Sequence, residues 1–143
     1  MIHGIDTSFL VAVEVSGHPG HASARKLLGR LLGAGDSFAL APQVLGEFIH
    51  IVTDERRFAR PLAVPDARER AERWWTAREV VSAFPGEHTV PMFVAWLREH
   101  ALGRKRLLDT LLAATYFAND VQSIVTTNQR DFRVFGRFSV LEP

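Results

Sequence analysis

Short apolar runs alternate with amphipathic segments along the whole chain. The first run, Ile2–Ile5, ends at Asp6 and is typical of a buried strand, although His3 and Gly4 interrupt it. Similar short runs with turn-forming residues around them predict four more strands. They lie at Ser37–Leu40, Val80–Phe84, Ser123–Thr126 and Phe138–Leu141.

The segments between these runs carry apolar residues every three or four positions, which predicts helices. The expected helices are Thr7–Val15, Ala22–Leu32, Gln43–Thr53, a segment capped by Asp66 that contains Trp74 and Trp75, Val90–Leu102 and Arg104–Ala118. Alternation of strands and helices predicts an α/β sandwich around a mostly parallel sheet of four or five short strands. No repeat or linker divides the 143 residues, so we expect one domain over residues 1–143.

Composition excludes several classes of protein. The chain has no cysteine, which excludes disulfides, zinc–thiolate sites and thiol nucleophiles. No apolar run approaches the roughly 18 residues of a membrane span, and the N-terminus lacks the pattern of a signal peptide, so we expect a cytoplasmic protein without a membrane partner. Net charge is only +1. Two basic clusters stand out, at Arg56, Arg57 and Arg60 and at Arg104, Lys105 and Arg106.

Carboxylates follow or precede the predicted strands at positions that suggest a shared site. Asp6 ends the first strand, Glu47 lies about one turn into the helix after the second, and Asp109 lies near the start of the helix that leads to the fourth. Asn128 and Asp131 follow the fourth strand. Because ligands of open α/β sheets bind beyond the carboxyl ends of the strands, we expect these groups to meet at one sheet edge.

Each acid also has a simpler interpretation when it is taken alone. Asp6 and Asp131 suit helix or turn caps, Glu47 suits a solvated helix face, and Asp109 complements the positive end of its helix. Together, however, the acids would raise one another's pKa unless a cation neutralised them. Mg²⁺ or Mn²⁺, which take oxygen ligands and activate water against phosphodiesters, fit such a cluster.

Four segments carry a resemblance to a known family. They are IDTSFLVA, APQVLGEFIHIVTDERRFARPL, LLDTLLAATYFAND and IVTTNQRDFRVFGRF, in this order and over almost the whole chain. They resemble the PIN domains, and among them the VapC-like toxin ribonucleases of bacterial toxin–antitoxin pairs. The resemblance implies a PIN-like three-layer sandwich. It also implies that Asp6, Glu47 and Asp109 are the catalytic acids and metal ligands.

The fourth metal ligand stays open between two residues. The family often has an aspartate where this chain has Asn128, and the nearest acid here is Asp131. An asparagine binds a metal only through a neutral carbonyl oxygen, so Asn128 in this role would weaken metal binding. Ser8, from the resemblance, and Thr126, from its place beside the site, are supporting residues, although simple helix-start and strand preferences explain both as well.

The resemblance implies a metal-dependent endoribonuclease that acts as a toxin, forms a homodimer and is blocked by an antitoxin protein. Arg104, Lys105 and Arg106 are then candidate RNA-binding residues, with plain surface charge or contact with a partner's acids as the alternatives. Asn128 motivates a second hypothesis, a catalytically weakened PIN-fold protein that only binds RNA or antitoxin. A third, an aspartyl-phosphate phosphatase, lacks the second aspartate of its D-x-D motif, because Ser8 stands there.

Overall fold

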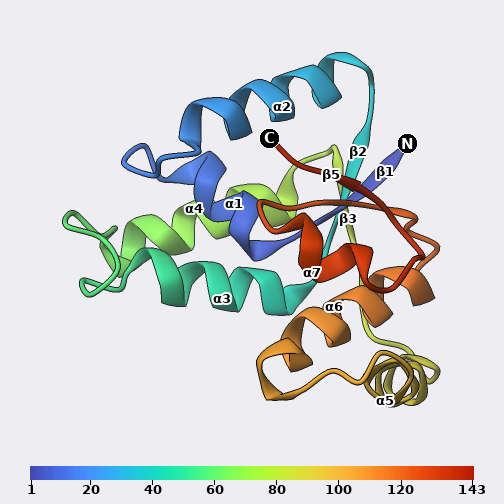
Figure 1. Cartoon of the computed structure of the whole chain (residues 1–143). Coiled ribbons are helices and arrows are strands. Elements are labelled where there is room, and N and C mark those ends of the chain that lie inside the picture. The colour runs from blue at the N-terminus through green and yellow to red at the C-terminus, as the bar shows by residue number, and fades with distance from the viewer.

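A five-stranded parallel sheet forms the centre of the computed structural model, which describes residues 1–143 (Figure 1). Its strand order is β3-β2-β1-β4-β5, and every neighbouring pair is parallel. The bounds are β1 Ile2–Ile5, β2 Ser37–Leu40, β3 Val80–Ser82, β4 Ser123–Val125 and β5 Ser139–Leu141. The predicted α/β sheet is confirmed, and it is parallel throughout.

The helices form two groups that cover the sheet and complete three layers (Figure 1). One group packs together as α1 Thr7–Glu14, α2 His21–Gly33, α3 Pro42–Val52 and α4 Val64–Thr76. The other contains α5 Thr89–Glu99, α6 Leu107–Ala118 and α7 Gln129–Arg133. This division follows from right-handed crossovers, since the chain moves across the sheet in one direction from β1 to β3 and in the other from β3 to β5.

Three local predictions differ from the structure. The segment Arg104–Ala118 is not one helix, because a 3₁₀ turn, η1, occupies Arg104–Arg106 and α6 begins at Leu107. Asp131, which taken alone suits a turn cap, lies instead in the first turn of α7, whose N-cap is Asn128. Asp66 lies in the first turn of α4 rather than at its cap, because the helix already begins at Val64 with Pro65 next. Proline suits a first turn, where its missing N–H leaves no bond unmade.

Tight packing of α6 against β1 sets the position of the sheet edge. Tyr116 of α6 is fully buried and donates a 2.6 Å hydrogen bond from its hydroxyl to the carbonyl oxygen of Ile5. A Cβ atom on Gly4 would lie only 2.6 Å from Cδ2 of that ring. Glycine at position 4 therefore lets α6 approach the central strand, which ends directly before Asp6. No helix is both long and apolar enough for a transmembrane span.

Candidate metal centre

Asp6 is held by hydroxyl groups at the carboxyl end of β1. It is buried, and its Oδ2 accepts hydrogen bonds from Ser8 Oγ at 2.5 Å and from Thr126 Oγ1 at 2.7 Å. Although Asp6 is the N-cap residue of α1, its side chain makes no capping hydrogen bond. The carboxylate is therefore directed to the end of β4, where Thr126 lies, and the structure brings both predicted supporting residues to it.

The two hydroxyls are themselves fixed by backbone amides. Thr127 N donates to Ser8 Oγ at 3.0 Å, and Asn128 N donates to Thr126 Oγ1 at 2.9 Å. Burial raises the pKa of Asp6, and the hydrogen bonds from Ser8 and Thr126 act against this rise. The arrangement keeps an acidic side chain in a buried place, where a cation beside its charged form would be strongly favoured.

Glu47 lies about one turn into α3 and is held by a residue next to Asp6. Thr7 Oγ1 donates to Glu47 Oε2 at 2.9 Å. The adjacent residues Thr7 and Ser8 thus orient two different carboxylates. The sequence indicated only that these hydroxyls follow Asp6, because the partner of Thr7 lies 40 positions away in the chain.

Asp109 lies in the first turn of α6, and its pKa is affected by the charges of the other three acids. Its pKa is raised to about 6, first by burial, then by the negative charges of Asp6 and Asp131, with a smaller effect of Glu47. The positive charge of Arg106 acts in the opposite direction. The charges of the other acids act on Asp109 because the acids lie near one another at one edge of the sheet, as the strand order predicts.

The side chain of Arg106 points toward the acid cluster and not toward solvent. Its Nε lies 3.4 Å from Asp109 Oδ2, and its Nη1 lies 3.4 Å from Asp131 Oδ1. Its Nη2 also donates to the carbonyl oxygen of Asp131. The structure therefore separates Arg106 from Arg104 and Lys105, which are exposed and form no ion pair. The i, i+3 spacing of Arg106 and Asp109 is the sequence signal for their pairing.

Asp131 and Asn128 differ in their relation to the cluster. The Asp131 carboxylate shares Arg106 with Asp109 and raises the pKa of Asp109. Asn128 is exposed. Its backbone amide donates to Thr126 Oγ1 and its carbonyl oxygen accepts from Asp131 N, whereas its side chain makes no capping hydrogen bond. Of the two candidates for the fourth ligand, the structure thus brings Asp131 to the other acids.

The donor set fits a hard divalent cation, although its side chains are not gathered around one point. No three histidine, aspartate or glutamate side chains meet at distances suited to a single ion. Arg106 lies between Asp109 and Asp131 and supplies the positive charge there. Carboxylates are oxygen ligands of the kind that Mg²⁺ and Mn²⁺ take, and the negative charges of Asp6, Asp131 and Glu47 all raise the pKa of Asp109. Binding of such an ion requires the ion pairs of Arg106 to loosen.

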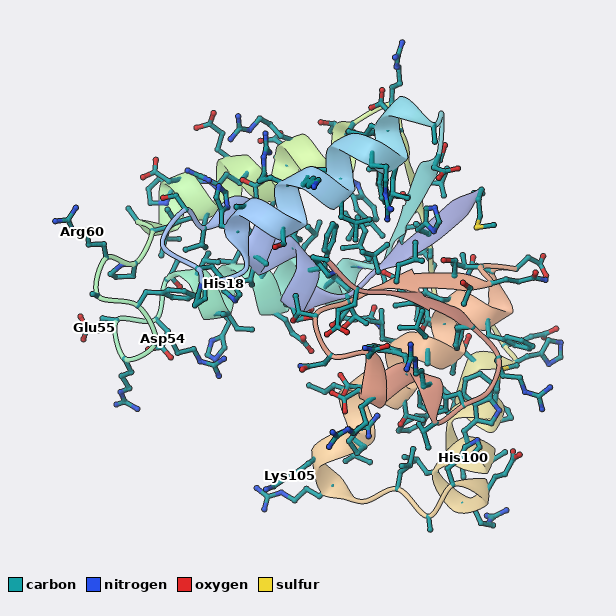
Figure 2. The ribbon with its side chains drawn as sticks, turned by 45° about the horizontal axis from the view of Figure 1, so that its top comes forward. His18, Asp54, Glu55, Arg60, His100 and Lys105 are labelled. Carbon is teal, nitrogen blue, oxygen red and sulfur yellow. The ribbon has the colours of Figure 1, made fainter.

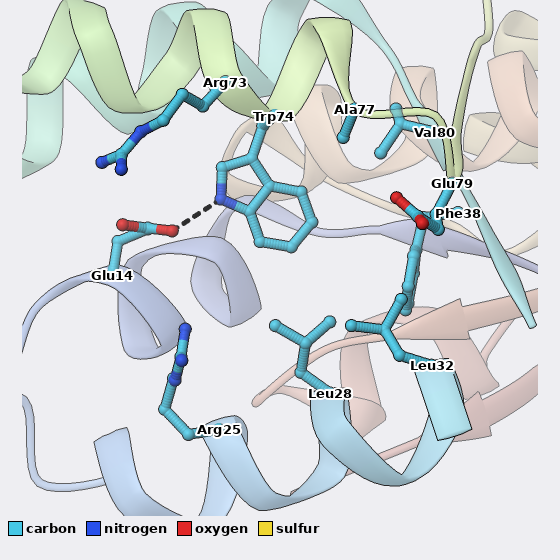
Figure 3. Close-up of a pocket in the computed structure, with 10 residues that line it drawn as sticks. All are labelled: Glu14, Arg25, Leu28, Leu32, Phe38, Arg73, Trp74, Ala77, Glu79 and Val80. Atoms are coloured by element: carbon cyan, nitrogen blue, oxygen red, sulfur yellow. Dashed lines mark hydrogen bonds between the residues drawn. The ribbon is translucent and has the colours of Figure 1, made fainter. Parts of the chain in front are cut away.

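Another cavity, of about 320 Å³, lies between α2 and α4, away from the acids (Figure 3). Its one well-buried carboxylate, Glu14, is already satisfied by Trp74 Nε1 at 2.7 Å and by Arg70 Nη1 at 3.0 Å. The rest of its wall is largely apolar, with Leu28, Leu32 and Phe38. This cavity therefore holds no unpaired buried acid, and the acid cluster is the better candidate for chemistry.

Similarity to known proteins extends over nearly the whole chain. The family model described as the PIN domain matches residues 5–137. Ribonuclease VapC24 of Mycobacterium tuberculosis H37Rv is 30% identical over 144 residues, which cover 97% of this chain and 94% of that protein. VapC ribonuclease Mb2897 of Mycobacterium bovis is 31% identical over 139 residues, which cover 97% and 93%.

Two solved structures share the fold at low identity. VapBC2 from Rickettsia felis, bound to a DNA fragment from its promoter, superposes with a TM-score of 0.69 at 16% identity and covers 99% of this chain and 98% of that one. Mycobacterium tuberculosis VapC20, a toxin that cleaves the sarcin–ricin loop, gives a TM-score of 0.64 at 21% identity and covers 87% of each chain. At these identities the two structures support the three-layer fold alone.

Proposed function

The chain belongs to the PIN-domain family, and we propose that it is a divalent-metal-dependent endoribonuclease, the toxin of a toxin–antitoxin pair. The observation that carries the proposal is the cluster of Asp6, Glu47, Asp109 and Asp131 at one sheet edge, in which burial and mutual repulsion raise the pKa of Asp109 to about 6. The two relatives whose alignments cover 97% of this chain are both named ribonucleases. These facts support RNA as the substrate.

In this proposal Asp6, Glu47, Asp109 and Asp131 hold Mg²⁺ or Mn²⁺ through carboxylate oxygens. When bound, such an ion activates water and stabilises the negative charge that develops on a phosphodiester. Ser8 and Thr126 keep Asp6 oriented, and Thr7 does the same for Glu47. Asn128 contributes its backbone amide to the support of Thr126 rather than a ligand atom.

A protein antitoxin is the proposed partner, and one surface suits it. A groove between α3 and α4 is lined by Leu45, Ile49 and Trp75 among other residues, and these three side chains are partly exposed. Solved structures with a similar fold include a toxin–antitoxin complex from Klebsiella pneumoniae, with a TM-score of 0.64. We further propose that the chain forms a homodimer, which sedimentation of the purified protein tests.

Cleavage of total bacterial RNA by the purified protein, with Mn²⁺ or with EDTA, tests the function. We expect discrete fragments with Mn²⁺ and none with EDTA, and we expect Asp6→Asn and Glu47→Gln to abolish cleavage. Glu55→Gln, in the exposed loop after α3, serves as the matched control and should cleave normally (Figure 2). If folded wild-type protein binds RNA or antitoxin but cuts neither with Mn²⁺ nor with Mg²⁺, the hypothesis of a catalytically weakened protein replaces this one.

A further inference from the structure

A groove of about 330 Å³ between α3 and η1–α6 joins the acid cluster to basic residues from two distant parts of the chain. Glu47 and Asp109 are the two acids in its wall. The remaining lining residues are His50, Ile51, Arg57, Arg104, Lys105 and Leu108. The groove therefore carries three full positive charges and an imidazole beside the two carboxylates proposed to bind metal.

The positive groups in the groove are largely free to bind an outside anion. Arg104 and Lys105 are exposed, and Lys105 projects outward from η1 (Figure 2). Arg57, in the loop after α3, makes one ion pair, from its Nε to Asp54 Oδ2 at 3.4 Å, and its side chain is 54% exposed. Asp54 Oδ1 also accepts a 2.9 Å hydrogen bond from Arg56 N, which fixes the start of this loop.

We propose that this groove binds the phosphate backbone of single-stranded RNA beside the bond to be cut. Arg57 and His50 contact the backbone from the α3 side, and Arg104 and Lys105 contact it from η1. The inference rests on the proposed ribonuclease function, and it adds His50 and Arg57 to the candidate RNA-binding residues. Arg106 takes no part, because its guanidinium is directed into the acids.

Three features favour RNA phosphates over another anion. The acids at the groove would repel phosphate unless a divalent cation neutralised them, so the site is built for phosphate and metal together. Guanidinium groups bind phosphate oxygens through two parallel hydrogen bonds. Leu108, which is 64% exposed, gives the groove an apolar wall beside its charges, as a nucleotide with a flat apolar base and a charged backbone requires. The volume of the groove lies at the small end of the usual range for ligand sites, which suits a single strand of RNA.

The test is binding of a fluorescein-labelled, single-stranded RNA of mixed sequence and about 12 nucleotides. Fluorescence anisotropy is measured over a range of salt concentrations, both in EDTA and with Ca²⁺, a divalent cation that takes oxygen ligands and can neutralise the acids, with a gel to verify that the RNA stays intact. We expect Arg57→Gln to weaken binding roughly fivefold to tenfold, as for loss of one charged hydrogen-bond partner. The slope of log K against log salt should fall by about 0.7, the value for one phosphate contact on a single strand.

Arg60→Gln is the matched control, because Arg60 lies in the same loop with the same charge but is not a lining residue of the groove and projects outward from the loop (Figure 2). It should leave affinity and salt slope nearly unchanged, and Arg57→Lys should recover part of the affinity. If wild-type protein cleaves RNA with Mn²⁺ but Arg57→Gln and Arg60→Gln bind RNA equally well, the groove assignment is wrong and the ribonuclease stands. If wild-type protein neither binds nor cleaves RNA, both proposals fail.

Discussion

Replacement of Asp109 by asparagine should make the metal-free protein more stable at neutral pH. The folded protein raises the pKa of Asp109 from 3.8 to about 6, so it binds the proton of this carboxyl more tightly than the unfolded chain does. Stability is therefore lost as the pH rises from about 4 to about 6 and stays lost above. Asparagine resembles the neutral carboxyl and removes this loss.

The size of the effect follows from the pKa shift and the exposure of the side chain. A shift from 3.8 to about 6 corresponds to about 3 kcal/mol at full value. Because the Asp109 side chain is 31% exposed, solvent screens part of this energy, and we expect about 1–2 kcal/mol. For a chain of this size, that is an increase in Tm of about 3–8 °C.

The assay is thermal unfolding of wild type and Asp109→Asn in EDTA at several pH values, with Glu55→Gln as a surface control. The difference should be full at about pH 8 and shrink as the pH falls from about 6 to about 4, while Glu55→Gln stays within about 0.5 kcal/mol of wild type. Millimolar Mn²⁺ should stabilise wild type through binding and reduce the difference. A variant that is less stable than wild type at every pH would refute the reasoning, because Asp109 would then stabilise the fold as a charged group.

Three further predictions test other parts of the structure. Gly4→Ala should lower the free energy of unfolding by roughly 1–3 kcal/mol in urea titrations, since its Cβ would lie 2.6 Å from the buried Tyr116 ring; an unchanged midpoint would contradict the close packing of α6 on β1. The Met1 ammonium and His3 hold the pKa of Asp36 below its ordinary value, so Asp36→Asn should reduce Tm at neutral pH, and the reduction should vanish as the pH falls through the lowered pKa of Asp36. Arg106→Gln should raise Mn²⁺ affinity at about pH 8 several-fold in calorimetry, because Arg106 competes for Asp109 and Asp131; a lower affinity would mean that Arg106 positions these ligands.

The sheet and the helices were predictable because their signals are local. Apolar runs of the right length and the alternation of elements give the parallel α/β order, and the strand ends bring Asp6 and Asp109 to one edge. The 3₁₀ turn at Arg104–Arg106 was not predictable in this way, because helical periodicity continues through it into α6. Helix boundaries depend on tertiary contacts that no short window contains.

The features of the site that could not be predicted from the sequence are contacts between side chains that lie far apart in the chain. The bond from Thr7 to Glu47 and the pairing of Arg106 with Asp131 each depend on how separate elements pack. Likewise, Arg57 joins Arg104 and Lys105 only because the loop after α3 lies across a groove from η1. Residue type, spacing and the family resemblance predicted the acids, whereas side-chain orientation in the structure distinguished Arg106 from its two basic neighbours.

The central claim, that the acid cluster cleaves RNA with a bound divalent ion, is tested most directly by one titration. Mn²⁺ is added to metal-free protein and RNA, and bound Mn²⁺ and the initial rate of cleavage are measured in the same samples, by electron paramagnetic resonance and by gel. The rate should rise in parallel with bound Mn²⁺, and both should be lost in Asp109→Asn. Cleavage at full rate in EDTA, or full Mn²⁺ binding by Asp109→Asn, would contradict the account.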